Sequence, residues 1–195
     1  MPRGVPNVPL TPFHYPLAYA MRKAAKRAGL ELDMAGLAIG SFTPDVECPF
    51  FALGAWLGLL PATEPYVQAH RLVLHSLFGA LTLGPLITIA IVFLLRHLLR
   101  AQIEALGVRS SSLLNLYISS ALGNLSHVLI DAMQHSYNPL LFPFTAQNVM
   151  ALVPLGDLAL GNAIAYAIVL PSSLAILAYE ALRGPYLLTR LLFDA

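Results

Sequence analysis

The sequence predicts an all-α integral membrane protein: a helical bundle with about three long membrane helices, an N-terminal helical hairpin and a short re-entrant or interfacial segment. Two observations lead to this fold class. Hydrophobic residues make up 57% of the 195 residues and charged residues only 11%, whereas an ordinary soluble domain is about a quarter charged. Several uncharged runs are also long enough to cross a bilayer, so we expect lipid to solvate part of a single domain, residues 1–195.

The first third of the chain predicts an arm, a hairpin and a short apolar helix. Residues 1–13 hold four prolines and one arginine and are expected to be extended. A helix over 17–29 ends in a basic cluster, and a second apolar leg over 34–42 leads into a turn at Pro44 and Asp45. The apolar stretch 49–60 is too short to span the hydrocarbon, which needs about 20 residues, and suits a re-entrant or interfacial segment.

Three longer runs predict the membrane helices. Residues 77–95 carry no charge and are followed by Arg96 and Arg100. Residues 111–134 are apolar at first and then polar, and 158–179 form a further uncharged run with Pro171 inside it. A proline at that position removes one backbone hydrogen bond and is expected to kink the helix.

Polar residues on the second of these helices predict a metal site. His127, Asp131 and His135 are spaced four apart, and four helical steps advance the direction of a side chain by only about 40°. The three side chains therefore share one face, and imidazole nitrogens and carboxylate oxygens are good ligands for zinc and similar ions. The alternative is a helix end with a solvated histidine or a capping aspartate. Because three such residues share one face, we favour the interpretation as a metal site.

Other ionisable residues gather at the ends of apolar segments. His70 and His75 precede the 77–95 run, and either one is a ligand supported by the other, or both are interfacial. Asp45 follows a predicted turn and can point back at a site, while Glu47 could equally belong to a plain polar loop. His97 lies at the opposite end of its helix and is excluded. Five of the six histidines lie at such ends: His14, His70, His75, His127 and His135.

Four motifs together resemble a known family. They are TPFHYP (11–16), IGSFTPDVE (39–47), HRLVLHS (70–76) and GNLSHVLIDAMQH (123–135). This set resembles the YdjM-type family of membrane-bound proteins regarded as metal-dependent hydrolases, which has archaeal-style relatives of unknown function. The resemblance implies metal ligands at His14, Asp45, His70 or His75, His127 and Asp131, with His135 as a further candidate. The order of ligands is also similar to that of zinc-dependent phospholipase C, as a pattern only.

Two functions follow from these residues. The first is a hydrolase in which one or more divalent ions, zinc by preference, activate water for attack on an ester, most naturally a phosphoester of a lipid or amphiphile. Glu47 or a spare histidine such as His135 would then act as general base. The second is a non-enzymatic membrane protein with a structural metal site. The net charge of +1 gives no indication of a nucleic-acid partner, and the oligomeric state is left open.

The basic residues predict an orientation. If the metal ligands mark one end of the bundle, the chain path places nine of the eleven lysines and arginines at the other end, all except Arg3 and Arg71. Basic residues near short loops mark the cytoplasmic side of a membrane protein. We therefore expect a multi-pass protein of the cell membrane whose metal site lies on the outer face.

Overall fold

The computed structural model describes residues 14–59, 73–134, 138–145 and 158–194, and every regular element in these ranges is a helix. Four longer helices define the molecule: α1 (Tyr15–Arg27), α6 (Leu83–Leu98), α8 (Leu113–Gln134) and α9 (Leu158–Leu182). Short helices connect and cap them: α2 (Met34–Gly40), η2 (Thr43–Val46), α3 (Glu47–Trp56), η3 (Val73–His75), α5 (Leu77–Leu81), α7 (Arg100–Ala105), α10 (Leu187–Thr189) and η6 (Arg190–Asp194). The all-α class predicted from composition is confirmed.

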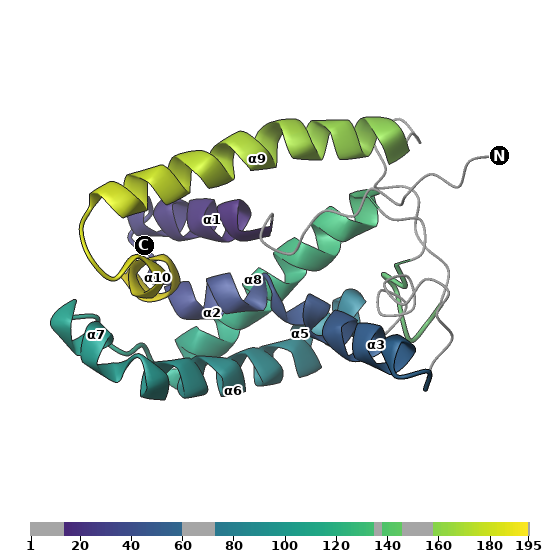
Figure 1. Cartoon of the computed structure of the whole chain (residues 1–195), viewed down its shortest axis with the longest axis horizontal. Helices are drawn as coiled ribbons and strands as arrows, with labels where there is room; N and C mark the ends of the chain where they lie inside the picture. Colours follow the sequence, from purple (N-terminus) through teal and green to yellow (C-terminus); the bar gives the residue numbers. More distant parts are fainter. Residues whose placement is uncertain (1–13, 60–72, 135–137, 146–157, 195) are drawn as a thin grey trace.

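The short helix α2 lies at the centre of the fold, between α6 and α8 (Figure 1). All seven of its residues are buried. Its start is fixed by Asp33, whose side chain accepts a hydrogen bond from the Gly36 amide at 2.8 Å and whose other oxygen pairs with Arg96 at 2.8 Å. Asp33 therefore acts as the N-cap that fixes the start of α2, and its ion pair with Arg96 fixes the position of α2 against α6.

Contact between α2 and α8 is close because both helices present residues without bulky side chains. Gly36 and Gly40 lie one turn apart on α2, and a Cβ atom at Gly40 would come within 2.6 Å of the Ser120 carbonyl oxygen. A Cβ at Gly123 of α8 would come within 2.4 Å of the Leu37 carbonyl oxygen. Small residues spaced four apart let helix backbones approach each other in this way, especially where lipid supplies no hydrophobic driving force between helices.

The run predicted as one continuous helix over 77–95 is instead two helices that meet at Thr82. Pro85 has no N–H to donate to the carbonyl of Leu81, four residues earlier. That carbonyl accepts the Tyr117 hydroxyl at 2.6 Å instead, and Thr82 turns its hydroxyl back to the Phe78 carbonyl at 2.7 Å. The break ends the short α5 and starts α6 in a new direction, so the predicted single helix is wrong in this detail.

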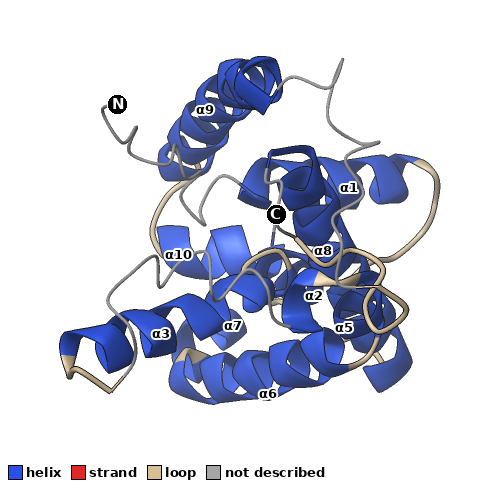
Figure 2. Ribbon diagram, turned by 90° about the vertical axis from the view of Figure 1, so that its right-hand side faces the viewer, coloured by secondary structure: helices blue, strands red, loops and turns tan. Residues whose placement is uncertain are grey.

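The helix α9 stands apart from the other long helices. It runs along the edge of the molecule on the side away from α6, in both views (Figures 1 and 2). It packs against α1 and α8, yet only 6% of its most apolar window is buried. Ala159–Leu182 and Leu113–Met133 are the two described helices that are long and apolar enough to cross a membrane.

A buried ionic cluster holds the end of α9. The carboxylate of Glu180, which is fully buried, accepts hydrogen bonds from Tyr19 at 3.0 Å and Arg183 at 2.9 Å. The guanidinium of Arg190 lies 3.6 Å from the same carboxylate and also donates to the Glu180 carbonyl. These contacts join the C-terminal segment, in which the sequence shows no motif, to α1.

The apolar segment predicted over 49–60 corresponds to α3, which has no buried residue. Its large side chains point outward, with Trp56 80% and Phe50 70% exposed. A helix this apolar and this exposed is consistent with an interfacial or re-entrant position. Cys48, in the first turn of α3, is only partly buried.

Candidate metal centre

Four ionisable side chains from three separate elements converge at one point. Asp45 comes from η2, His75 from η3, and His127 and Asp131 from α8. All four are buried, and one ligand atom from each lies within 4.8 Å of the others. The convergence of these residues, predicted from motifs up to 86 positions apart in sequence, is present in the structure.

Local structure explains how each of the four reaches the centre. His127 and Asp131 share a face of α8 because they are four residues apart. His75 is placed by the start of α5, where Ser76 caps the helix by accepting from the Gly79 amide at 3.0 Å. Asp45 lies on the 3₁₀ turn after Pro44, and Thr43 anchors that turn by a hydroxyl contact of 2.7 Å with Thr88 on α6.

Four of the six separations between the donor atoms match those around a single ion. His127 Nε2 lies 3.1 Å from Asp131 Oδ2 and 3.6 Å from Asp45 Oδ1. His75 Nε2 lies 3.5 Å from Asp45 Oδ1 and 3.6 Å from Asp131 Oδ2. Ligands bound at about 2.0–2.2 Å to a tetrahedral ion are separated from each other by roughly 3–4 Å.

The imidazole of His127 is oriented for metal binding. Its Nδ1 lies 2.8 Å from the carbonyl oxygen of Ser41, the residue that ends α2. A carbonyl only accepts, so Nδ1 carries the proton, and in the neutral ring Nε2 turns a lone pair toward two carboxylates. Either a proton on Nε2 or a metal ion would bring this nitrogen and the negative oxygens together, and a metal-ligating histidine is held in this way through its other nitrogen. The donor set therefore fits a divalent ion and could bind one.

His14 lies beside this group rather than within it. Its ring stacks on that of His127, with centroids 3.7 Å apart, and its Nε2 lies 3.4 Å from Asp131 Oδ1. The two oxygens of Asp131 thus face different partners: Oδ2 faces His75 and His127, and Oδ1 faces His14. This placement is compatible with the predicted role of His14 as a ligand, and it would let Asp131 bridge two ions.

The remaining predicted site residues have different outcomes. His70 and His135 lie outside the described residues, so their roles stay predictions. Glu47 opens α3 two residues after Asp45 and is partly buried, and its role as general base also stays a prediction. His97, which was excluded, is exposed in the last turn of α6.

Sequence reasoning missed two features of the site. Cys48 lies with its Sγ 3.8 Å from Asp45 Oδ1, and burial, followed by the nearby Asp45 charge, raises the pKa of its thiol. Asn124 donates to Thr88 Oγ1 at 3.1 Å and to the Ser120 carbonyl at 2.8 Å, one turn before His127. Asn124 belongs to the same polar run as His127 and Asp131. A buried amide in an apolar helix requires hydrogen-bond partners, so the sequence already indicated that Asn124 contacts a neighbouring helix.

Comparison with known families identifies the family of the chain. The family described as YdjM inner membrane protein matches residues 14–192, nearly the whole chain. The chain belongs to the YdjM family. It is therefore a membrane protein, which agrees with its two long apolar helices. No curated protein and no solved structure matches the chain. The family match begins at His14 and includes every residue of the four-donor group.

The protonation state of His14 gives a pH-dependent prediction. Burial, followed by the charge of His127, lowers the pKa of His14 from 6.5 to about 3. The folded protein keeps His14 neutral while the unfolded chain takes up a proton below pH 6.5, so this stability is present above pH 6.5 and is lost as the pH falls toward 3. Between pH 7 and pH 5 the loss is about 2 kcal/mol.

Unfolding of chelator-treated protein in detergent, followed at several pH values, measures this effect. The His14→Gln variant, which cannot titrate, is expected to give a flatter curve than the wild type below pH 6.5. Parallel curves for the two proteins would show that His14 does not stay neutral in the fold.

Proposed function

We propose that the protein is a membrane enzyme that uses a divalent metal ion, zinc by preference, to hydrolyse an ester, most naturally a phosphoester of a lipid or amphiphile. The observation that carries this proposal is the buried group of two imidazoles and two carboxylates. A divalent ion bound there would supply Lewis acidity and lower the pKa of a coordinated water. The site lies among helices of a membrane protein, which makes a lipid headgroup the natural substrate.

The donor types favour catalysis over the alternative, a structural metal site. Structural zinc sites are commonly built from cysteines and are closed, whereas catalytic zinc sites use histidines and carboxylates and leave a position open. Catalysis here would require that one of the four donors gives way to water or that the ion accepts a fifth ligand. The chain has one cysteine, Cys48, which touches Asp45 but is outside the four-donor group. Asp45, His75, His127 and Asp131 would hold the ion, His14 would fix the second oxygen of Asp131, and Glu47 or His135 would take the proton from water.

The hydrolase proposal is tested with purified protein in detergent. The protein is stripped with a chelator, reloaded with zinc, and assayed for phosphate or alcohol release from phosphatidic acid and from a soluble aryl phosphodiester. We expect turnover with metal, none after chelation, and none in His127→Ala. Tight stoichiometric metal binding with no hydrolysis, and with unfolding on metal removal, would instead support the structural site.

For the membrane arrangement we propose that α8, α9 and the α5–α6 pair cross the bilayer. The α1 helix, with 13 residues, extends only about 20 Å and stops short of spanning. The ends of α1, α6 and α9 that carry basic residues and the start of α8 lie at one end of the long axis, together with α7 (Figure 1). By the positive-inside rule that end is cytoplasmic, and the metal centre belongs to the outer half of the protein.

Cysteine labelling tests this orientation. In a Cys48→Ser background, single cysteines replace Arg100, whose side chain is 78% exposed on α7, and Phe144, which is 93% exposed after α8. An impermeant thiol reagent added to intact cells is expected to label position 144 and to label position 100 only after lysis. Labelling of position 100 but not of position 144 in intact cells would show that the orientation is inverted.

A further inference from the structure

An apolar cavity lies between α1 and α9, and two of its lining residues are close in sequence to His14 and Asp131. It has a volume of about 530 Å³, within the range of pockets that bind small ligands. Its walls are formed by Pro16, Leu17 and Ala20 of α1 and by Ile168 and Ala175 of α9, among others. Pro16 follows His14 by two residues, and Ile130, which closes the cavity on the α8 side, precedes Asp131.

The cavity offers almost no group that could recognise a polar ligand. Its two polar residues already have partners, because Ser172 donates to the Ile168 carbonyl at 2.7 Å and the Tyr19 hydroxyl to Glu180 at 3.0 Å. Sugars, nucleotides and free phosphate would lose their hydrogen bonds to water there without replacement. A hydrocarbon chain makes no hydrogen bonds to water, so it has none to lose when it enters the cavity.

The rim of the cavity faces the surroundings of α9. Leu17 is 40% and Ile168 62% exposed, and α9 is the long apolar helix that packs least against the rest of the chain. In a membrane these outward side chains meet acyl chains. Lipid is therefore the apolar molecule available at this opening at the highest concentration.

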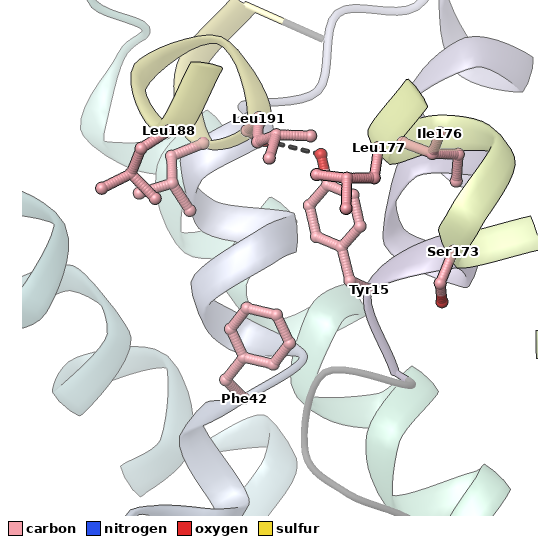
Figure 3. A pocket seen from close by; sticks show the side chains of 8 residues that line it. Tyr15, Phe42, Ser173, Ile176, Leu177, Leu188 and Leu191 are labelled. Carbon is pink, nitrogen blue, oxygen red and sulfur yellow. Dashed lines mark hydrogen bonds between the residues drawn. The ribbon is translucent and has the colours of Figure 1, made fainter. Parts of the chain in front are cut away.

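A second, smaller cavity of about 240 Å³ lies on the other side of the first turn of α1. Tyr15 and Phe42 line it together with α9 and the C-terminal helices, and the Tyr15 hydroxyl donates to the Leu191 carbonyl at 2.7 Å (Figure 3). Both cavities include Ile176 of α9. The residue before Tyr15 is His14, so apolar space flanks the segment that carries it on two sides.

We propose that the α1–α9 cavity binds an acyl chain of a membrane lipid, whose headgroup ester then lies at the metal centre. The inference rests on the proposed function and names its substrate class: a lipid with a long acyl chain rather than a water-soluble ester. The metal centre would take the polar end, and the cavity, which begins within two residues of His14, would take the hydrocarbon.

The test uses the full chain in nanodiscs that contain phosphatidic acid with a photoreactive group at the end of one acyl chain. Labelling is expected to concentrate on the cavity walls, in α1 near Ala20 and in α9 between Ile168 and Ile176. Ala175→Phe and Ala20→Phe fill the cavity from opposite walls and should each reduce this labelling. Ala167→Phe, at an exposed position of α9 that does not line the cavity, should leave it unchanged.

Hydrolysis provides a separate readout. Zinc-loaded wild type should prefer long-chain over short-chain phosphatidic acid by at least about tenfold in kcat/KM, because each buried methylene contributes to binding. The cavity-filling variants should lose this preference, whereas Ala167→Phe should keep it. Localised labelling without any hydrolysis would support the lipid site while the proposed function fails.

Three results would overturn the inference. One is labelling spread evenly over the outward face of α9 and unaffected by Ala175→Phe. Another is hydrolysis of short-chain and long-chain lipids at equal rates, which would leave the metal-dependent function standing. The third is a change of oligomeric state in Ala175→Phe with unchanged labelling, which would show that a second copy of the chain covers the cavity.

Discussion

Replacing Asp131 with asparagine is expected to weaken metal binding by more than about 100-fold, since even the loss of residues that only support metal ligands costs 10–100-fold. The carboxylate of Asp131 is 1% exposed and lies within 3.6 Å of three imidazoles, those of His14, His75 and His127. The amide keeps the shape but removes the negative charge and one acceptor. Metal content after dialysis and calorimetric titration with zinc measure the loss.

The matched control is His97→Ala. His97 is an exposed histidine at the far end of α6 and lies outside the four-donor group. Its removal should change neither metal content nor activity. Unchanged metal content in folded Asp131→Asn would mean that the ion, if bound, is held elsewhere.

Substitution of Gly123 by valine is expected to destabilise the fold by about 3 kcal/mol and to weaken metal binding with it. A Cβ at this position would lie 2.4 Å from the Leu37 carbonyl oxygen and 3.0 Å from the Ser41 amide nitrogen. These are backbone atoms, so α2 itself must move away from α8. Ser41 orients His127 through its carbonyl, and Asp45 follows four residues later, so the displacement separates the donors.

Thermal unfolding in detergent and zinc titration should therefore change together in this variant. Gly123→Ala should show a smaller effect in the same direction. Ala163→Val adds side-chain atoms at an exposed position of α9 and should leave both measurements unchanged. A Gly123→Val protein with wild-type stability and wild-type zinc affinity would contradict the assigned close approach of α2 and α8.

The sequence by itself determined the helical class and most of the candidate site. Uncharged runs of sufficient length predict helices whatever surrounds them, because backbone hydrogen bonds must be satisfied internally in lipid. The spacing of His127 and Asp131 places both on one face of a helix regardless of tertiary context. The turn at Pro44 and the position of His75 at the start of an apolar run were also visible, and the structure brings these residues together.

One local error and one missed feature had signals in the sequence. Pro85 leaves the Leu81 carbonyl without its helical donor, and this accounts for the break that divides residues 77–95 into α5 and α6. Cys48 follows Asp45 by three residues, so on a helical turn the two side chains are neighbours. Neither signal was decisive alone, since membrane helices often continue through proline and one cysteine has many possible environments.

Only the tertiary structure decided which helices meet. The approach of α2 to α8 depends on the absence of side chains at Gly36 and Gly40 on one helix and at Gly123 on the other. These two helices are far apart in sequence, so the glycines do not indicate a contact until the helices face each other. The pairing of Glu180 with Tyr19 and Arg190 joins residues up to 161 positions apart. Helical periodicity shows which residues share a face, but protein-facing and lipid-facing surfaces are equally apolar, so hydrophobicity cannot tell which face meets a neighbouring helix and which meets the membrane.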